Sequence, residues 1–280
     1  HIKKQYVIIL KNMENESTAE KLLNEGLELL SSEKPQKQKK GFYSLRGATA
    51  LGHMKAFYYE GVCYKEGLGI YQSDEQAFER FLVAADEVPE AKYELGLCYI
   101  HGMGTEQDID KAVACFSDAA QRGVPEAQYE LGVCYRRGEG VEQDIKVALY
   151  WYEKAASQGY LRAYHNIGIV YQHGLGGIPT DYNKAFNYFL KAANEESTEP
   201  YFCIGNCYLN GLGVEKNEKE AARWFQKAAE LGEPDSMFHL AWMYQEGVGV
   251  ERNSELSTEY LYKAAEAGWE PAIRIIKGEN

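Results

Sequence analysis

The sequence predicts an all-α fold, an α-solenoid in which antiparallel helix pairs stack along one array. A unit of two helical patterns joined by a Gly-rich loop, best seen between Glu126 and Gly159, recurs along most of the chain. The Gly of its LGVCY segment has equivalents at spacings of 35, 36, 36, 37 and 36 residues, the last replaced by Ala: Gly61, Gly96, Gly132, Gly168, Gly205 and Ala241. The second residue of an Ala-Ala pair keeps the same five spacings, from Ala85 to Ala265. Two independent anchors with one period indicate a repeat array, whose units must stack because none can bury its apolar face alone.

Composition and charge narrow the possible classes of function. The chain has 280 residues, is 45% hydrophobic and carries a formal net charge of −12. No basic run offsets this charge, so we expect no general affinity for nucleic acid or for anionic membranes. No apolar stretch approaches the roughly 20 residues needed to cross a bilayer, and the run Tyr6–Leu10 is too short for a signal peptide. We expect a monomer that inserts into no membrane and, because the chain opens with His1 rather than Met, an excised or tagged piece of a protein.

Four of the six cysteines hold one repeat position, directly before a Tyr: Cys63, Cys98, Cys134 and Cys207. Equivalent helices in a stack lie roughly 10 Å apart, whereas a disulfide needs Cα atoms within about 7 Å, so these four should not pair. Cys203 lies one turn from Cys207 on the same helix, and Cys115 stands alone on another. We expect free thiols that pack as small hydrophobes, which favours a reducing compartment and a cytoplasmic location.

The N-terminal part departs from the repeat pattern. Residues 1–16 show no repeat signal and are expected to form a tail. From Ser17 to Leu30 apolar residues recur at helical spacing, and the polar residues 31–40, which include Pro35, predict a loop. Since residues 41–52 align with the end of a repeat, we interpret 17–52 as a degenerate N-terminal capping repeat, because arrays commonly end in atypical units.

Six fuller repeats occupy residues 53–268. Each first helix begins near a small residue and ends at a Gly-x-Gly pair, such as Gly138 and Gly140, where the chain should take a left-handed conformation that favours Gly. Each second helix opens with a side chain that can cap its exposed N–H groups, which stabilises a helix by about 1 kcal/mol; these residues are Ser73, Asp108, Asp144, Asp181, Asn217 and Asn253.

The small residues predict how the two helices of a repeat pack. Gly in the LG segment and Ala in the Ala-Ala pair should let the backbones approach, while nearby Tyr and Phe side chains fill the space around the contact. Ala241, which replaces this Gly in the sixth repeat, should push its helices slightly apart. Residues 269–280 begin another first helix and should cover the last repeat as a C-terminal cap.

The third repeat carries the recurring pattern most completely, with Ala127, Tyr129, Leu131, Gly132, Tyr135, Gly138, Gly140, Val141, Asp144, Ala148, Trp151, Tyr152, Lys154, Ala155, Ala156 and Gly159. This pattern resembles the Sel1-like repeat family, relatives of the tetratricopeptide repeat, over roughly residues 53–268. The resemblance implies a right-handed superhelix and a non-enzymatic adaptor that binds other proteins, often in signalling, secretion or protein quality control. A cysteine-rich branch of the family joins the two helices of each repeat by a disulfide, and that pattern is absent here, because Cys115 is the only Cys on a second helix.

Signals for catalysis are weak, and we expect neither a cofactor nor a metal. Ser31-Ser32-Glu33-Lys34 matches the S-x-x-K motif of penicillin-recognising enzymes, but it lies in a polar segment before Pro35 rather than at a buried helix start. The Gly-x-Gly pairs lack the third Gly and the preceding strand of a dinucleotide-binding loop. A hydrolase or β-lactam-binding protein, and a regulatory arm of a larger signalling protein, remain alternatives to the scaffold.

By analogy with tetratricopeptide arrays, the first helices should line a concave groove, with positions three before and one, four and five after the LG glycine facing inward. The predicted partner-binding residues are Tyr93, His101, Tyr129, Val133, Arg136, Arg137, Arg162, His165, Gln172, His173, Asn206, Asn210 and Trp242. The aromatic residues among them could equally serve only packing between helices. Because Arg and His residues would gather in the middle of an acidic chain, we predict that the groove binds an acidic or C-terminal peptide. Solvated charges without a partner are the alternative.

Overall fold

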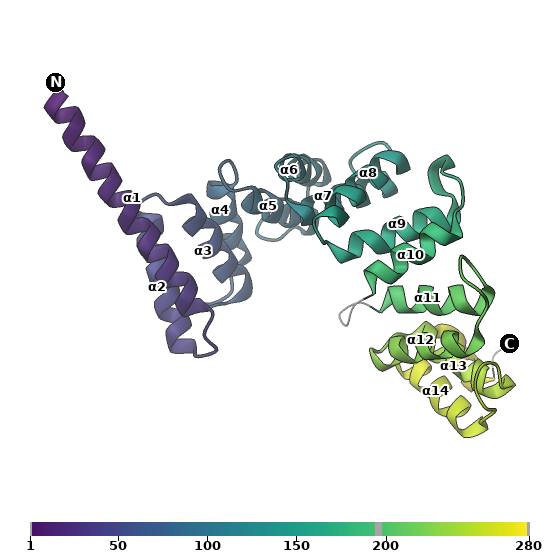
Figure 1. Ribbon diagram of the computed structural model, residues 1–280. Coiled ribbons are helices and arrows are strands. Elements are labelled where there is room, and N and C mark those ends of the chain that lie inside the picture. Colours follow the sequence, from purple (N-terminus) through teal and green to yellow (C-terminus); the bar gives the residue numbers. More distant parts are fainter. Residues whose placement is uncertain (1, 194–197, 279–280) are drawn as a thin grey trace. The chain divides into compact units, whose positions relative to one another are not determined.

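The computed structural model describes residues 2–193 and 198–278, and over these ranges the chain is helical, with turns and short loops between helices (Figure 1). It divides into two compact units, His1–Gln143 and Asp144–Asn280. The first unit contains α1 (Ile2–Leu30), α2 (Pro35–Ala50), α3 (Met54–Glu66), α4 (Asp74–Ala84), α5 (Pro89–His101), α6 (Ile109–Gln121) and α7 (Pro125–Arg137). The second contains α8 (Ile145–Ser157), α9 (Leu161–His173), the short 3-10 helix η1 (Leu175–Gly177), α10 (Tyr182–Ala192), α11 (Glu199–Asn210), α12 (Glu218–Glu230), α13 (Pro234–Glu246), α14 (Ser254–Glu266) and α15 (Glu270–Lys277).

Within each unit, consecutive helices pack as antiparallel pairs, and each pair packs on the next one along the chain. In the first unit the pairs are α1 with α2, α3 with α4 and α5 with α6; in the second they are α9 with α10, α11 with α12 and α13 with α14. Helix α3 also packs on α2, α5 on α4, α11 on α10 and α13 on α12. Within each unit, helices therefore contact their neighbours in sequence, which confirms the predicted α-solenoid.

The N-terminal pair differs from the prediction at two points. Residues 2–16, expected as a tail, continue α1, which begins at Ile2 rather than at Ser17. The loop expected over residues 31–40 is a short turn, because Pro35 opens α2; Pro is well suited to this first helical position, since its missing N–H would be unpaired there anyway. Helices α1 and α2 meet through Gly26 and Gly41, and a Cβ added at Gly41 would lie 2.8 Å from the carbonyl oxygen of Gly26.

The predicted helix ends are confirmed at both positions of each repeat. Ser73, Asp108, Asp144, Asp181, Asn217 and Asn253 each accept a hydrogen bond from a backbone N–H in the first turn of their second helix. The first helices end at glycines with φ between 63° and 74°, among them Gly138 at 72°. The loop is then closed by the N–H of the capping residue, which donates to the carbonyl of a first-helix Tyr, as from Asp108 to Tyr99 at 2.9 Å.

The two glycines of each loop meet different surroundings. At Gly247 an added Cβ would find no neighbour closer than 3.5 Å, so only the positive φ requires Gly there. At Gly249 the Cβ would lie 2.1 Å from the carbonyl oxygen of Glu218, at the start of α12 in the preceding repeat. The second glycine thus also permits a close contact between successive repeats.

The LG glycine leaves room for an aromatic ring of the second helix. The prediction was that it lets the two helix backbones approach each other. A Cβ at Gly61, Gly96, Gly168 or Gly205 would lie 2.5–2.7 Å from the Cε1 atom of a buried Phe on the second helix of the same repeat; these rings belong to Phe81, Phe116, Phe189 and Phe225. The edge of the flat ring fits against the backbone that the missing Cβ leaves open. In the sixth repeat the smaller Leu261 occupies the Phe position, which offsets the extra methyl group of Ala241 and removes the reason to expect a wider separation there.

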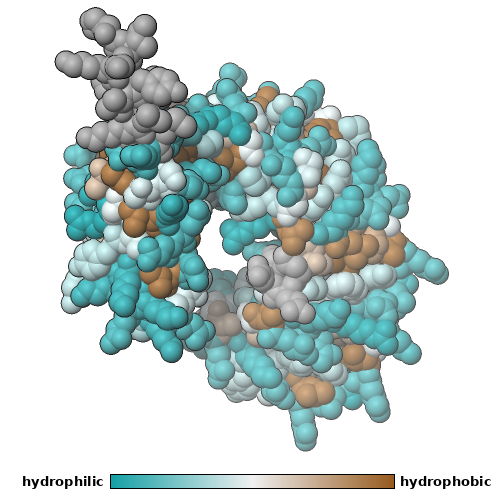
Figure 2. Space-filling view, turned by 60° about the vertical axis from the view of Figure 1, so that its left-hand side comes forward, coloured by the Kyte–Doolittle hydropathy of each residue, from teal (hydrophilic) through white to brown (hydrophobic). Residues whose placement is uncertain are grey.

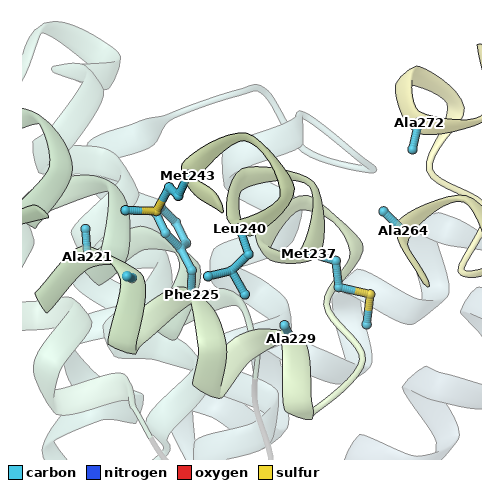
Figure 3. Packing of buried hydrophobic residues seen from close by; sticks show 9 residues of the cluster. Ala221, Phe225, Ala229, Met237, Leu240, Met243, Ala264 and Ala272 are labelled. Atoms are coloured by element: carbon cyan, nitrogen blue, oxygen red, sulfur yellow. The ribbon is translucent and has the colours of Figure 1, made fainter. Parts of the chain in front are cut away.

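The last described helix, α15, lies in the segment predicted to be the C-terminal cap. Helix α15 packs on α14, where Ala272 and Ala264 face each other and both are fully buried (Figure 3). On the other side of this cluster, Leu240 and Met243 of α13 pack against Phe225 of α12. Residues 279 and 280 of the predicted cap lie outside the described residues.

The face drawn in Figure 2 is mostly hydrophilic, with scattered apolar side chains. Exposed large hydrophobic residues include Leu82, Trp242 and Ile275. Among the described helices, none has the length and apolarity that spanning a bilayer would require.

Candidate functional site

The predicted partner-binding residues lie on the first helices of the repeats. On α9, Arg162, His165, Gln172 and His173 have the spacing that places side chains along one face of a helix. Tyr129, Val133, Arg136 and Arg137 occupy the corresponding positions of α7 in the first unit. The structure therefore places these residues on two stripes, one on α7 in the first unit and one on α9 in the second.

The aromatic position of the first helices packs against the second helix of the same repeat. Its ring centroid lies 6.0 Å from that of Phe116 for Tyr93, 5.8 Å from Phe189 for His165 and 5.8 Å from Phe225 for Phe202. All three first-helix side chains remain half-buried. The contacts explain why a ring recurs at this position and favour packing as its first role.

The stripe on α9 is the more polar of the two. Arg162 and His173 are exposed, whereas His165 and Gln172 are half-buried. The buried Oε1 atom of Gln172 accepts no hydrogen bond from any described residue. At the position of Arg162, the other first helices of the last five repeats carry acids: Glu90, Glu126, Glu199 and Asp235. Helix α9 therefore reverses the charge at this position.

The stripe on α7 is tied to the loop that follows it. The carbonyl of Arg136 accepts a hydrogen bond of 2.7 Å from Nε2 of Gln143, and Nη1 of Arg137 lies 3.5 Å from Oε1 of Glu139. Arg137 is exposed, so this surface ion pair contributes little to stability and can exchange for another carboxylate.

Glu94 of α5 lies near two residues of the neighbouring first helix α3. Burial raises the pKa of Tyr58 well above its usual range, and the nearby Glu94 raises it further. Glu94 also holds Nζ of Lys65 at 2.9 Å. His101, at the end of α5, is exposed.

The remaining predicted residues lie on α11 and α13. Nδ2 of Asn210 donates to the carbonyl of Asn206 at 3.0 Å, one turn earlier on α11. Trp242 on α13 is 43% exposed. Trp242 is therefore the largest exposed apolar side chain among the predicted positions.

Comparison with known proteins identifies the family. The Sel1 repeat family model matches residues 50–87, 89–124, 125–160, 161–197, 204–233 and 234–269. The chain belongs to the Sel1 repeat family. A search of curated proteins gave no match.

Two solved structures support the same assignment. The Sel1 repeat protein from Oxalobacter formigenes is 30% identical, with a TM-score of 0.78, over 87% of this chain and 96% of that one. The structure of c5321, a protective antigen of uropathogenic Escherichia coli strains displaying an SLR fold, is 27% identical, with a TM-score of 0.81, over 93% of this chain. The chain spans 56% of the c5321 structure.

The cysteines of this Sel1 repeat chain are free, as predicted. Burial raises the pKa of Cys63, Cys98 and Cys203 to about 12, and that of Cys134 and Cys207 to about 11. A thiol is nucleophilic only as the thiolate. These residues therefore serve as small core side chains of the repeats.

The weak catalytic signals of the sequence gain no support from the geometry. Ser31 lies in the exposed turn between α1 and α2, where its Oγ donates to the carbonyl of Glu28 at 2.7 Å, and Lys34 is also exposed. Within residues 2–193 and 198–278, no group of three or more His, Cys, Asp or Glu side chains is arranged to hold a metal ion.

Sequence reasoning missed a buried charge in the first repeat. Glu60 occupies the position of Leu in the LG segment and is 1% exposed, while Arg80 occupies the position of Trp or Tyr on the second helix. Nε of Arg80 lies 3.2 Å from Oε1 of Glu60 in an ion pair that lacks hydrogen-bond geometry, and Nε of Arg46 lies 3.9 Å from the same oxygen. The signal was present in the alignment of repeats, because both residues depart from an apolar position in the same repeat.

Proposed function

We propose that this protein is a non-enzymatic scaffold that binds a protein or peptide partner on the first-helix face of its repeats. The observation that carries the proposal is the stripe on α9, where exposed Arg162 and His173 flank half-buried His165 and Gln172. A rigid helix that presents a ring, a cation and an amide along one face suits recognition of a polypeptide.

The chemistry of the stripe favours an acidic or C-terminal segment as the partner. Arg162 replaces the acid found at this position in α5, α7, α11 and α13, so α9 offers positive charge on a chain with a net charge of −12. A guanidinium group can engage a carboxylate through two parallel hydrogen bonds.

A peptide library tests this proposal. Peptides with free C-terminal carboxylates are selected on the full chain, and the selected peptides are measured again as C-terminal amides. We expect binding by the acids, weaker binding by the amides and loss of binding in Arg162→Glu. The matched control is Arg223→Glu, a charge reversal on the exposed side of second helix α12, which should bind as the parent does.

The double change Arg136→Glu and Arg137→Glu tests whether the α7 stripe takes part. We expect unchanged helicity and a weaker complex, because both residues lie at the last turn of α7 and Arg137 is exposed. If Arg162→Glu and this double variant both bind the selected peptides as the parent does, the first-helix face is not the site.

We further propose a reducing, cytoplasmic location. Free thiols at Cys63, Cys98, Cys115, Cys134, Cys203 and Cys207 support this, since such compartments keep cysteines reduced. Thiol titration of the denatured, unreduced protein purified from its source should give six thiols, and two or more disulfides would contradict the proposal.

A further inference from the structure

One position of the second helix separates the second repeat from the others. The residue before the buried Phe, or before its Tyr or Leu equivalent, is a large aromatic in the last four repeats: Trp151, Tyr188, Trp224 and Tyr260. In the second repeat this residue is Cys115. The second repeat therefore lacks a ring where the later repeats have one.

The fourth repeat shows what the ring does. Tyr188 of α10 stacks on Tyr171 of α9, with centroids 5.9 Å apart and planes at 2°. Nζ of Lys184 lies 4.9 Å from the Tyr171 centroid. The sixth repeat contains the same stack. There the ring of Tyr260 lies on that of Tyr244, with centroids 5.8 Å apart and planes at 5°.

The second repeat keeps the first-helix Tyr of this stack but lacks the second-helix ring that lies on it. Tyr99 is the equivalent of Tyr171. Nζ of Lys111 lies 5.4 Å from the ring centroid of Tyr99, and Lys111 thus takes the place that Lys184 has beside Tyr171 in the fourth repeat. Where Tyr188 would be, Cys115 is small and 6% exposed. A groove of about 840 Å³ opens at this point between α4, α5 and α6, with Leu95, Tyr99 and Cys115 among its lining residues. This volume is in the range of ligand pockets.

The rim of the groove adds an apolar contact and hydrogen-bond acceptors. Leu82 of α4 lines the groove and is 52% exposed. Asp86 and Asp118 also line it, each within 4 Å of a cation: Nζ of Lys92 lies 3.7 Å from Asp86, and Nη1 of Arg122 lies 3.5 Å from Asp118. Each carboxylate of the groove thus has a cation beside it and can still accept a hydrogen bond from an indole N–H or a phenol O–H.

We propose that this second-helix groove binds a Trp or Tyr side chain of a protein partner, which stacks on Tyr99 in the place that the later repeats fill with a ring of their own. The occupant follows from the chain itself, because Tyr188 and Tyr260 stack on the equivalents of Tyr99. The third and fifth repeats carry Trp at the same position, and Trp224 stacks on Tyr201 of its own first helix. Elsewhere a departure from the repeat pattern is matched by a second one, as with Glu60 and Arg80. Beside Cys115, the one aromatic among the described residues that line the groove is Tyr99, against whose ring Phe78 of α4 packs edge-on with centroids 5.6 Å apart. The groove lies in the first unit and the α9 stripe in the second, and they share no residue, so each can be tested by variants of its own.

Cys115→Trp is the decisive variant, because it supplies the ring that the other repeats carry and thereby fills the groove. The probes are N-acetyl-tryptophan amide and N-acetyl-leucine amide, and binding to the full chain is followed by saturation-transfer NMR. We expect a saturable signal for the tryptophan probe, a much weaker one for the leucine probe and loss of the tryptophan signal in Cys115→Trp. Equal signals from both probes, or an unchanged signal in Cys115→Trp, would overturn the proposal.

Two exposed positions supply the controls. Val83→Trp adds the same side chain on α4 outside the groove and should leave binding unchanged. Leu82→Asp places a charge at the exposed rim and should weaken binding of the tryptophan probe; it decides the question if Cys115→Trp fails to fold. An unchanged signal in Leu82→Asp in that case would overturn the proposal.

A peptide selection then tests the kind of partner. A display library is selected on the parent chain and counter-selected on Cys115→Trp. Enriched peptides should share a Trp or Tyr and should still bind Arg162→Glu, which separates this groove from the first-helix site. Enrichment of peptides without an aromatic residue, or no enrichment, would contradict a partner of this chemistry.

Discussion

The first and sixth repeats both depart from the pattern of the four repeats between them, and they do so in different ways. In the first repeat a charge enters the core, since Glu60 replaces Leu and Arg80 replaces an aromatic residue. In the sixth repeat the departure is one of size, because Ala241 replaces Gly while Leu261 replaces Phe. Each change is accompanied by a second one on the facing helix of the same repeat.

The difference shows which physical property each pair must conserve. A buried carboxylate is tolerated only with a cation beside it, because an isolated buried charge loses its hydration without compensation. An added methyl group is tolerated only where the facing side chain becomes smaller, because protein cores are close-packed. The first repeat conserves charge balance, and the sixth conserves volume.

The largest effect is expected from removing the cation of the first repeat. Arg80→Leu leaves Glu60 buried, with only Arg46 at 3.9 Å to balance it. We expect this variant to lower the free energy of unfolding by about 3 kcal/mol, the range found when one partner of a buried ion pair is removed. Guanidinium unfolding and hydrogen exchange of the α2–α4 amides would measure it.

The double variant Glu60→Leu with Arg80→Trp is the matched control. It restores the residues of the other repeats, and we expect stability equal to or above that of the parent, since apolar replacements of buried ion pairs are often neutral or stabilising. A double variant as unstable as Arg80→Leu would show that the ion pair is not what compensates these two positions.

A smaller effect should distinguish the two loop glycines of the sixth repeat. Gly247→Ala should cost about 1 kcal/mol, because its φ of 74° is left-handed but the site has room. Gly249→Ala should cost about 3 kcal/mol, because its Cβ would also collide with the carbonyl of Glu218. Melting temperatures compare the two variants, and an equal loss in both would contradict the proposed contact between repeats.

The volume balance of the sixth repeat gives the next effect. Leu261→Phe alone overfills the space beside Ala241 and should cost about 1–3 kcal/mol. Adding Ala241→Gly provides the space that Gly205 gives to Phe225 in the fifth repeat, so the double variant should recover most of the loss. Chemical denaturation of both variants measures this coupling, and independent, additive effects would rule it out.

The smallest expected effect is a pH dependence in the sixth repeat. Burial raises the pKa of Asp235 to about 6, and the neighbouring Glu233 adds to the rise. Since the folded state then holds a proton that the unfolded state has lost, stability should fall as pH rises from about 4 to 6, and should then level off. Asp235→Asn should flatten this part of a melting-temperature profile, whereas Asp110→Asn, an exposed acid on α6, should not.

Local signals in the sequence predicted most of the fold. The period of Gly132 and its equivalents can be read directly from the sequence. Capping side chains such as Asp108 and loop glycines such as Gly138 act on backbone groups a few residues away, so their role can be inferred without a structure. The misplaced loop at residues 31–40 has the same origin, because Pro35 is compatible with a loop and with the first turn of a helix. For the candidate site, helical spacing was enough to place Arg162, His165, Gln172 and His173 on one stripe.

The sequence by itself determined the repeat, its helix ends and the class of fold, because hydrophobic period, caps and glycines are properties of neighbouring residues. Only the tertiary structure decided which side chains meet across helices: that Gly96 faces the edge of Phe116, that Glu60 meets Arg80, and that a groove remains beside Cys115. These contacts join residues about 20 positions apart on antiparallel helices. Their register is set by close packing of the whole pair and not by any local pattern.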